Sequence, residues 1–266
     1  TILTTSFLHS EKLRRHIRFL LSKGSMYQVC NGNLMFHGCI PMDENGSFEN
    51  VEIEGGSFSG KALLDEINVL VNKAYFSREN TYARDFMWYL WCGPRSPLYG
   101  KDKLAFFEQY FIEDRELRRE NYNHYYTFSE KPEVCRMILR HFSIDEDRGH
   151  IINGHVPVKI KDGEHPVKAD GKLFVIDGGI SKAYQQATGI AGYTLIYDSH
   201  GLSLAEHKPF IPGIPGQTPE IHIVEKLQSR ANISDTDKGK ALLELIGDLH
   251  ELLEAYRSGS IKEKNL

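Results

Sequence analysis

Two short segments place a histidine beside a glycine where an apolar run ends, and both could contribute to a metal site. His155 follows Gly154, which lets the backbone come close, and precedes Pro157, which stiffens the exit from the strand. His37 follows a second apolar run and precedes Gly38. An imidazole is a common metal ligand, and a strand tip holds it in place. The two histidines are therefore candidates for half of a metal site.

Composition narrows the class of protein. The chain has 266 residues, of which 41% are hydrophobic and 26% charged, with a formal net charge of -4 and a pI near 6.3. This length permits a sizeable core, and the charge balance argues against nucleic acid or an acidic membrane as partner. The sequence has no apolar run of about 18 residues and no signal-peptide pattern at its start. We expect a soluble, cytoplasmic protein.

The four cysteines are scattered, without a Cys-x-x-Cys pair, at Cys30, Cys39, Cys92 and Cys135. This spacing favours reduced thiols over a disulfide framework, and we expect small, buried apolar residues. The chain starts at Thr1 without an initiator Met, which fits processing, trimming or a longer protein.

Hydrophobic periodicity predicts the elements that position the histidines. Asn31-Gly32, between apolar runs, predicts a β-hairpin over 26–36 whose second strand leads to His37. Short apolar or alternating runs predict strands at 151–152, 173–176, 193–197, 202–205 and 221–224. Amphipathic patterns predict helices over 11–23, 61–75, 82–90, 103–111 and 130–142. The fold class is therefore α/β (α+β), with a helical middle third followed by a β-rich part.

A long final helix is predicted from Asp235 or Thr236, both good N-caps, to about Ser258. Its apolar residues form one stripe: Leu242, Leu245, Ile246, Leu249, Leu253 and Tyr256. Packing against the body of the protein or against another subunit explains this stripe. We also expect a homo-oligomer. The Pro- and Gly-rich segment 210–216 is expected to be a surface loop.

Five separated blocks, in the same order as in the family, resemble the class III (Firmicutes-type) fructose-1,6-bisphosphatases of bacteria. They are residues 27–41, 91–103, 151–159, 171–179 and 188–197, and the resemblance covers nearly the whole chain. These enzymes are calcineurin-like metallophosphatases. The resemblance implies a β-sandwich flanked by helices, with a helical insertion at about 56–145, a β-rich part at about 150–230 and a C-terminal helix at about 235–258.

The resemblance also implies the chemistry. The expected reaction is hydrolysis of the 1-phosphate of fructose 1,6-bisphosphate to fructose 6-phosphate in gluconeogenesis, by hydroxide activated at two manganese ions. Two-metal phosphatases activate the attacking oxygen and stabilise charge on the phosphoryl group. His37 and His155 match the two late histidine ligands of the family. The earlier family ligand motifs, Asp-x-His, Gly-Asp-x-x-Asp-Arg and Gly-Asn-His, have no counterpart in this chain.

Three segments imitate these missing motifs without matching them. Gly32-Asn33 is followed by Leu34, Asp147-Arg148 lacks the preceding Gly-Asp, and the segment 198–201 lies after His155. The chain is therefore expected to be the C-terminal part of a longer enzyme. Its partner would be the N-terminal part of that enzyme, and alone it would be inactive. No leaving-group acid is identified.

The substrate phosphates need cationic or hydrogen-bonding donors. Loops within or beside the matched blocks offer Arg95, Lys101, Lys182 and Tyr184 as candidates. Other conspicuous residues have structural interpretations: His150 belongs to the strand interior, His124 to aromatic packing, and Arg115, Arg118 and Arg119 to a solvated helix face.

Two other functions are compatible with the sequence. One is a calcineurin-like phosphatase with another phosphoester as substrate. The other is a non-catalytic assembly or regulatory domain that self-associates through the final helix.

Overall fold

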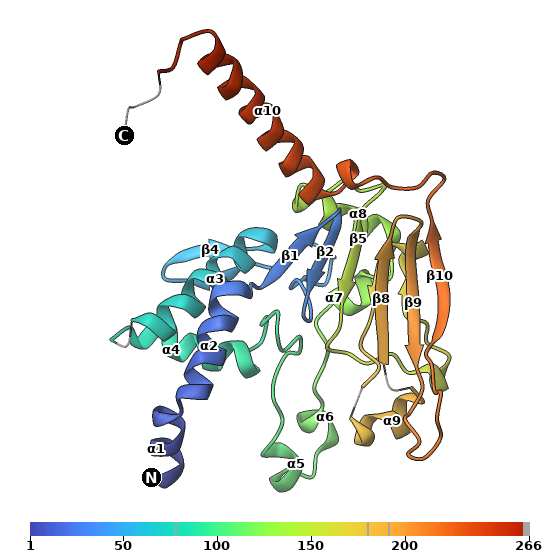
Figure 1. Ribbon diagram of the computed structural model, residues 1–266. Coiled ribbons are helices and arrows are strands. Elements are labelled where there is room, and N and C mark those ends of the chain that lie inside the picture. Colours follow the sequence, from blue (N-terminus) through green and yellow to red (C-terminus); the bar gives the residue numbers. More distant parts are fainter. Residues whose placement is uncertain (78, 180, 191, 263–266) are drawn as a thin grey trace. The chain divides into compact units, whose positions relative to one another are not determined.

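The computed structural model describes residues 1–77, 79–179, 181–190 and 192–262, without the side chains of Lys182 and Ala183 (Figure 1). The chain divides into two compact units, residues 1–190 and 191–266. The described residues form a mixed α/β fold with several sheets and a long final helix. The predicted α/β class is confirmed.

The first unit is organised around a five-stranded sheet. Its strands, in spatial order, are β1 (Tyr27–Cys30), β2 (Asn33–Phe36), β5 (His150–Asn153), β7 (Leu173–Val175) and β6 (Val167–Lys168). The central strands β2, β5 and β7 are parallel, whereas β1 and β6 pair antiparallel at the two edges. Because parallel strands point the same way, the carboxyl ends of the three central strands meet at one edge of the sheet.

The predicted hairpin is present, and its turn explains its register. Asn31 and Gly32 both have positive φ, 50° and 78°, as a two-residue turn of the type favoured in hairpins requires. Cys30 faces Asn33 and Tyr27 faces Phe36 across β1 and β2.

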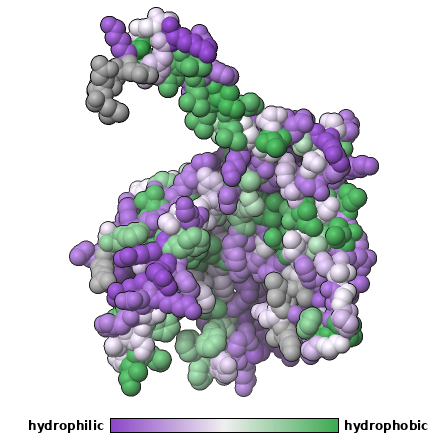
Figure 2. Space-filling view, in the orientation of Figure 1, coloured by the Kyte–Doolittle hydropathy of each residue, from purple (hydrophilic) through white to green (hydrophobic). Residues whose placement is uncertain are grey.

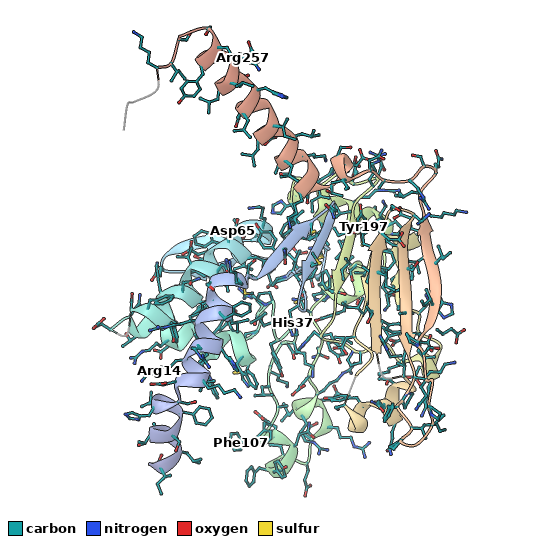
Figure 3. All side chains as sticks on the ribbon, in the orientation of Figure 1. Arg14, His37, Asp65, Phe107, Tyr197 and Arg257 are labelled. Carbon is teal, nitrogen blue, oxygen red and sulfur yellow. The ribbon has the colours of Figure 1, made fainter. Side chains whose placement is uncertain are left out.

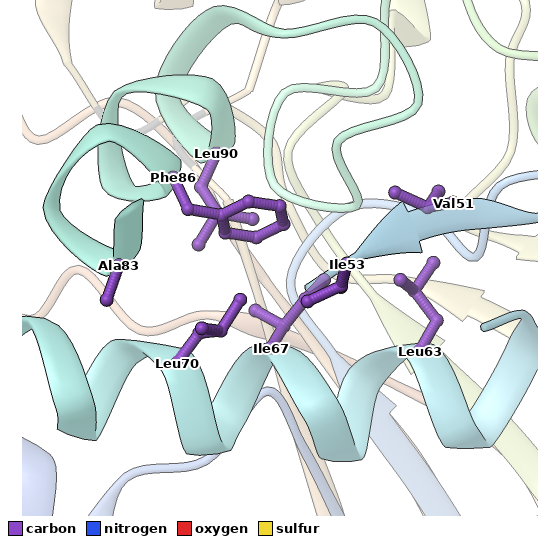
Figure 4. Close-up of a cluster of buried hydrophobic side chains, with 8 residues drawn as sticks. All are labelled: Val51, Ile53, Leu63, Ile67, Leu70, Ala83, Phe86 and Leu90. Carbon is purple, nitrogen blue, oxygen red and sulfur yellow. The ribbon is translucent and has the colours of Figure 1, made fainter. Parts of the chain in front are cut away.

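A helical region joins β2 to β5 and encloses much of the core. It starts with a small hairpin, β3 (Val51–Ile53) and β4 (Gly56–Phe58), and continues with α3 (Gly60–Phe76), α4 (Thr81–Cys92) and α8 (Pro132–His141). Apolar side chains from β3, α3 and α4 form one buried cluster, which includes Ile53, Ile67 and Phe86 (Figure 4). Two helices, α1 (Ile2–His9) and α2 (Glu11–Lys23), precede the sheet, and neither has a buried residue.

The helix predicted over 103–111 is wrong for most of its length, since only α5 (Glu108–Phe111) is helical there. The backbone N–H of Ala105 donates to the Glu120 carboxylate, and Lys101 forms a β-bridge with Tyr122. These contacts hold residues 103–105 outside a regular helix. The short helices α6 (Arg115–Arg118) and α7 (Tyr125–Phe128) follow.

The second unit contains an antiparallel sheet and the final helix. Its strand order is β10 (Glu220–Lys226), β9 (Gly201–His207) and β8 (Gly192–Asp198). The predicted loop 210–216 lies between β9 and β10. Helix α10 (Asp237–Arg257) begins after Thr236, whose hydroxyl accepts from the backbone N–H of Gly239. The predicted apolar stripe of α10 is exposed, and Figure 2 shows hydrophobic side chains along this helix.

Two general expectations can be compared directly with the structure. All four cysteines are free, but only Cys39 and Cys135 are buried, so the expectation of buried thiols is wrong for Cys30 and Cys92. Within the described ranges, the helices are too short or too polar to cross a bilayer.

His150, the first residue of β5, is a buried strand residue, in agreement with its structural interpretation from the sequence. Its buried ring packs against Phe174 with ring centroids 5.4 Å apart. Burial, together with the nearby Lys172 ammonium group, lowers the pKa of His150 to about 4 from 6.5. The folded state therefore excludes a proton that the unfolded chain takes up below about pH 6.5.

This burial predicts an acid-sensitive fold. Stability that depends on neutral His150 is present above pH 6.5 and is lost as the pH falls toward 4. Between pH 7 and 5 the free energy of unfolding should fall by about 2 kcal/mol more in the wild type than in His150→Phe, which keeps an aromatic ring but does not titrate. Urea unfolding at both pH values measures the difference. Equal losses in the two proteins would contradict it.

Candidate metal centre

The edge where β2, β5 and β7 end gathers three side chains that could do chemistry. His37 comes directly after β2, as Figure 3 shows, and His155 comes two residues after β5. Asp177 comes two residues after β7. Residues 118 positions apart in the sequence are therefore brought together by parallel strand pairing. The carboxyl ends of parallel strands are the usual place for a ligand site in such sheets.

The two imidazoles are in direct contact. Nε2 of His37 lies 3.1 Å from Nδ1 of His155. Two nitrogens that each lie about 2.1 Å from one metal ion, at angles between square and tetrahedral, are about 3.0–3.4 Å apart. The observed separation lies in the range for two ligands of one ion, although the two rings are hydrogen-bonded here and must exchange that shared proton for the metal.

A backbone carbonyl determines which ring nitrogen of His155 carries a hydrogen. Its Nε2 lies 2.8 Å from the carbonyl oxygen of Tyr99, which can only accept a hydrogen bond. Nε2 of His155 therefore carries the proton, and in the neutral ring Nδ1 presents its lone pair toward His37. A carbonyl that accepts a hydrogen bond from one ring nitrogen, and so orients the other, is typical of metal-binding histidines.

His155 sits in a strained turn. Its φ is 69°, and the N–H of Val156 donates to the carbonyl of Gly154 at 2.8 Å, the pattern of a γ-turn centred on the histidine. Such a backbone costs on the order of 1–3 kcal/mol and persists only where its surroundings impose it. The turn directs the His155 ring toward His37 rather than along the strand.

Buried contacts hold the loops that carry the two histidines together. The N–H of Gly154 donates to the carbonyl of His37 at 2.9 Å. The side-chain amide of buried Asn153 donates to the carbonyl of Gly38 at 3.2 Å and to the hydroxyl of Tyr125 at 2.8 Å. The hydroxyl group of Tyr125 lies inside the core. Asn153 thus joins both strand ends to the helical region.

Gly38 is needed for this arrangement. A Cβ atom at position 38 would lie 2.7 Å from the carbonyl oxygen of Pro97, closer than side chains tolerate. The N–H of Cys39 donates to the same carbonyl at 3.0 Å. The segment that includes Pro97 and Tyr99 can therefore pass close to the strand ends and place the Tyr99 carbonyl over His155.

Asp177 is the charged residue that the sequence analysis missed. Its carbonyl accepts from the N–H of Val158, and its carboxylate accepts from the N–H of Gly179, both at 2.8 Å. These bonds fix Asp177 beside the loop that carries His155. The signal in the sequence was an acid two residues after the third parallel strand.

The environment of His37 favours its neutral form. Although part of the His37 side chain is exposed, burial of its ring, and secondly the neighbouring His155, lower its pKa, while the Asp177 charge opposes this shift. A neutral imidazole is the form that binds metal.

The histidine pair opens into an apolar cavity of about 780 Å³. Its wall is formed by residues of α2, α3 and α4, by residues 24–26, by Leu98, Tyr99 and Leu104, and by both histidines. Leu20, Val71, Met87 and Trp91 are among them. None of the described residues that line this cavity is a lysine or arginine.

Two of the predicted substrate-binding residues have structural partners elsewhere. Arg95 pairs with Glu49 at 3.0 Å and donates to the carbonyl of Asn50 at 3.2 Å. Lys101 pairs with Glu120 at 2.6 Å. The structure brings neither of them into the cavity beside the histidines.

The other two lie in a helix rather than in the predicted loop. Lys182 and Tyr184 belong to α9 (Lys182–Thr188), which starts after Ser181 and ends before Gly189, whose φ is 85°. The Lys182 side chain lies outside the described residues. Tyr184 is exposed, and its Cβ lies so close to Gly179 that a side chain there would clash. Gly179 therefore serves the packing of α9.

The described residues hold no group of three or more His, Cys, Asp or Glu side chains that could bind a metal ion. In the segment 198–201, Asp198 accepts from the backbone N–H of His200, so this imitation of a ligand motif forms a turn between β8 and β9.

Comparison with known proteins identifies the family. The Firmicute fructose-1,6-bisphosphatase family model matches residues 1–258. Proteins named fructose-1,6-bisphosphatase class 3 are similar: that of Clostridium botulinum (strain Loch Maree / Type A3) is 49% identical over 274 residues, and that of Alkaliphilus metalliredigens (strain QYMF) is 51% identical over 274 residues. These alignments cover 99% and 98% of this chain but only 41% of each relative. No solved structure matches. The chain belongs to the Firmicute, or class 3, fructose-1,6-bisphosphatase family.

Proposed function

We propose that this chain forms part of a metal-dependent enzyme that hydrolyses the 1-phosphate of fructose 1,6-bisphosphate, giving fructose 6-phosphate and phosphate in gluconeogenesis. One observation carries the proposal: in a chain of this family, two imidazole nitrogens meet 3.1 Å apart at the ends of parallel strands. We call the longer polypeptide, with the part that the relatives carry outside the matched region, the complete enzyme.

His37 and His155 would hold one divalent ion of a two-metal site, with Nε2 and Nδ1 as ligand atoms. When bound, the metals would polarise the phosphoryl group and make water more acidic. Two imidazoles alone do not select manganese, which prefers oxygen ligands. We therefore expect the remaining, oxygen-rich ligands to come from the part of the complete enzyme outside the matched region.

The proposal includes the architecture and the location of the enzyme. Residues 1–266 would belong to a calcineurin-like catalytic domain, with 56–145 as a helical insertion, 150–230 as its β-rich part and 235–258 as its final helix. The parallel strands that end at the histidines, and the helical region between β2 and β5, support this assignment. The enzyme would act in the cytoplasm.

Phosphate release by the complete enzyme with manganese tests the function. Fructose 1,6-bisphosphate is compared with other sugar phosphates and with simple phosphomonoesters. We expect the highest kcat/KM for fructose 1,6-bisphosphate, and no turnover by residues 1–266 alone. A higher kcat/KM for another phosphoester would show that fructose 1,6-bisphosphate is not the substrate. If no phosphoester were hydrolysed, the proposed catalytic function would be wrong.

Asp177 is expected to strengthen metal binding through its charge. Asp177→Asn keeps an oxygen for the Gly179 N–H, so it removes the charge with little loss of structure. Manganese affinity of the complete enzyme should fall by about tenfold at pH 8, where His37 is neutral in either protein. Calorimetric titration measures it, with Asp162→Asn, an exposed acid of the same unit, as control. Unchanged affinity in Asp177→Asn would show that its charge plays no part.

The exposed stripe of α10 supports self-association. Leu249→Asp places a charge in the middle of the stripe and should convert the oligomer of the complete enzyme to a smaller species, as measured by light scattering. Glu251→Lys is a matched control, because two residues turn the helix by about 200° and place position 251 on the opposite face. A Leu249→Asp protein of unchanged mass would contradict this role of the stripe.

A further inference from the structure

The apolar cavity beside the histidine pair has an unusual composition for a substrate site. A sugar bisphosphate carries several negative charges and needs cationic donors. The described residues of the cavity wall include no lysine or arginine. Apart from its histidine end, this cavity is therefore unsuited to the phosphates of the substrate.

The wall of the cavity is itself poorly covered. The side chains of Trp91 and Leu20 are 71% and 66% exposed, and those of Met87 and Leu104 are also exposed. A small apolar ligand lies in a cleft that buries most of its surface, whereas here large apolar side chains remain open to solvent. Exposed Trp, Met and Leu side chains around a hollow are typical of a surface that another protein surface covers.

Helix α2 independently indicates that another protein surface covers the cavity. It forms one side of the cavity with Leu20 and Leu21, and it is strongly amphipathic, yet none of its residues is buried. A helix of 13 residues is marginal by itself and depends on packing of its apolar face. The described residues provide only part of that packing.

We propose that an apolar element of the complete enzyme, from the part outside the matched region, packs into this cavity and so brings the remaining metal ligands to His37 and His155. The inference rests on the proposed function. It follows from position: His37 and His155 form part of the cavity wall, so an element that fills the cavity lies next to their ligand atoms. The relatives carry about three fifths of their length outside the matched region, which is ample for such an element.

Thiol labelling of the complete enzyme tests the inference without using activity. Trp91→Cys and Trp88→Cys form a matched pair: both positions lie on α4, their side chains are 71% and 70% exposed, and only Trp91 lines the cavity. In residues 1–266 the two thiols should react with a maleimide at similar rates. In the complete enzyme, labelling at position 91 should be at least about tenfold slower than at position 88, because the covering element must first open. Both variants carry Cys92→Ser, because Cys92 lies in the same segment between Arg84 and Arg95, and mass spectrometry of the labelled peptides separates the new thiols from the other native cysteines.

Labelling at position 91 as fast as at position 88 in the complete enzyme would overturn the inference, since the cavity would then be open to soluble ligands. The result is independent of the reaction. A protected position 91 in an enzyme that does not hydrolyse fructose 1,6-bisphosphate would remove the proposed function and keep the covered cavity. An active enzyme whose position 91 is labelled as fast as position 88 would keep the proposed function and remove the covered cavity.

Discussion

Alanine in place of His37 or His155 is expected to lower kcat/KM of the complete enzyme for fructose 1,6-bisphosphate by about 10³-fold, because a bound metal contributes several kcal/mol of charge stabilisation. Each variant removes one nitrogen of the 3.1 Å pair. The double variant should lose no more than about tenfold beyond either single variant, since both ligands serve one ion. Phosphate release at saturating manganese measures the loss.

His200→Ala is the matched control for these variants. Asp198-Ser199-His200-Gly201 resembles a metal-ligand motif in sequence but forms a turn in the second unit. Its activity should stay within about twofold of wild type, as surface changes away from a site usually do. Activity that survives in His37→Ala and His155→Ala would remove both histidines from the mechanism.

Asn153→Ala is expected to have the largest effect on the fold near the site, lowering the free energy of unfolding by about 3 kcal/mol. The change leaves the Gly38 carbonyl and the buried Tyr125 hydroxyl without the amide that bonds them. The substitution also removes Asn153 Oδ1, a buried atom without a hydrogen-bond partner in the described part of the chain. Because such an atom destabilises the fold, its removal offsets part of the loss of the two hydrogen bonds. Urea unfolding of residues 1–266 measures it.

A double-mutant cycle with Tyr125→Phe separates the hydrogen bond from general packing. If the bond between Asn153 and Tyr125 contributes, the double variant should be more stable than the sum of the two single losses predicts, by about 1 kcal/mol. Strict additivity would show that the two residues act independently. Manganese binding should weaken in Asn153→Ala as well, since the two histidine loops lose a shared support.

Local signals in the sequence predicted the elements whose formation depends on neighbouring residues. Asn31-Gly32 predicted the hairpin that leads to His37, and both residues have the positive φ that this turn needs. Thr236 predicted the start of α10, where its hydroxyl caps the helix. In these cases the deciding interactions lie within a few residues of each other.

Contacts between distant segments decided the cases that the sequence could not resolve. The periodicity of 103–111 suits a helix, but the Glu120 carboxylate accepts from the backbone N–H of Ala105, and residues 103–105 do not join the helix. Lys101 looked available for a phosphate, but the same Glu120 holds it in an ion pair. A partner 15 or 19 residues away leaves no local pattern.

At the candidate metal site, too, local sequence signals predicted some features, whereas contacts between distant segments decided the others. Motifs named His37 and His155 as candidates, and their contact follows from the parallel pairing of β2 with β5. Asp177 was missed because its place beside them depends on β7 lying next to β5. For α9, a local signal existed: Ser181 before the helix and Gly189 after it are common helix boundaries. The sequence analysis instead expected Lys182 and Tyr184 in a loop.

The central claim is that one divalent ion binds between His37 and His155. The most direct test is a crystal structure of the complete enzyme with manganese, with the metal located by its anomalous scattering. We predict a peak within about 2.1–2.3 Å of both Nε2 of His37 and Nδ1 of His155. Manganese bound at another position, with the two imidazoles still joined by a hydrogen bond, would contradict the claim that one ion binds between them.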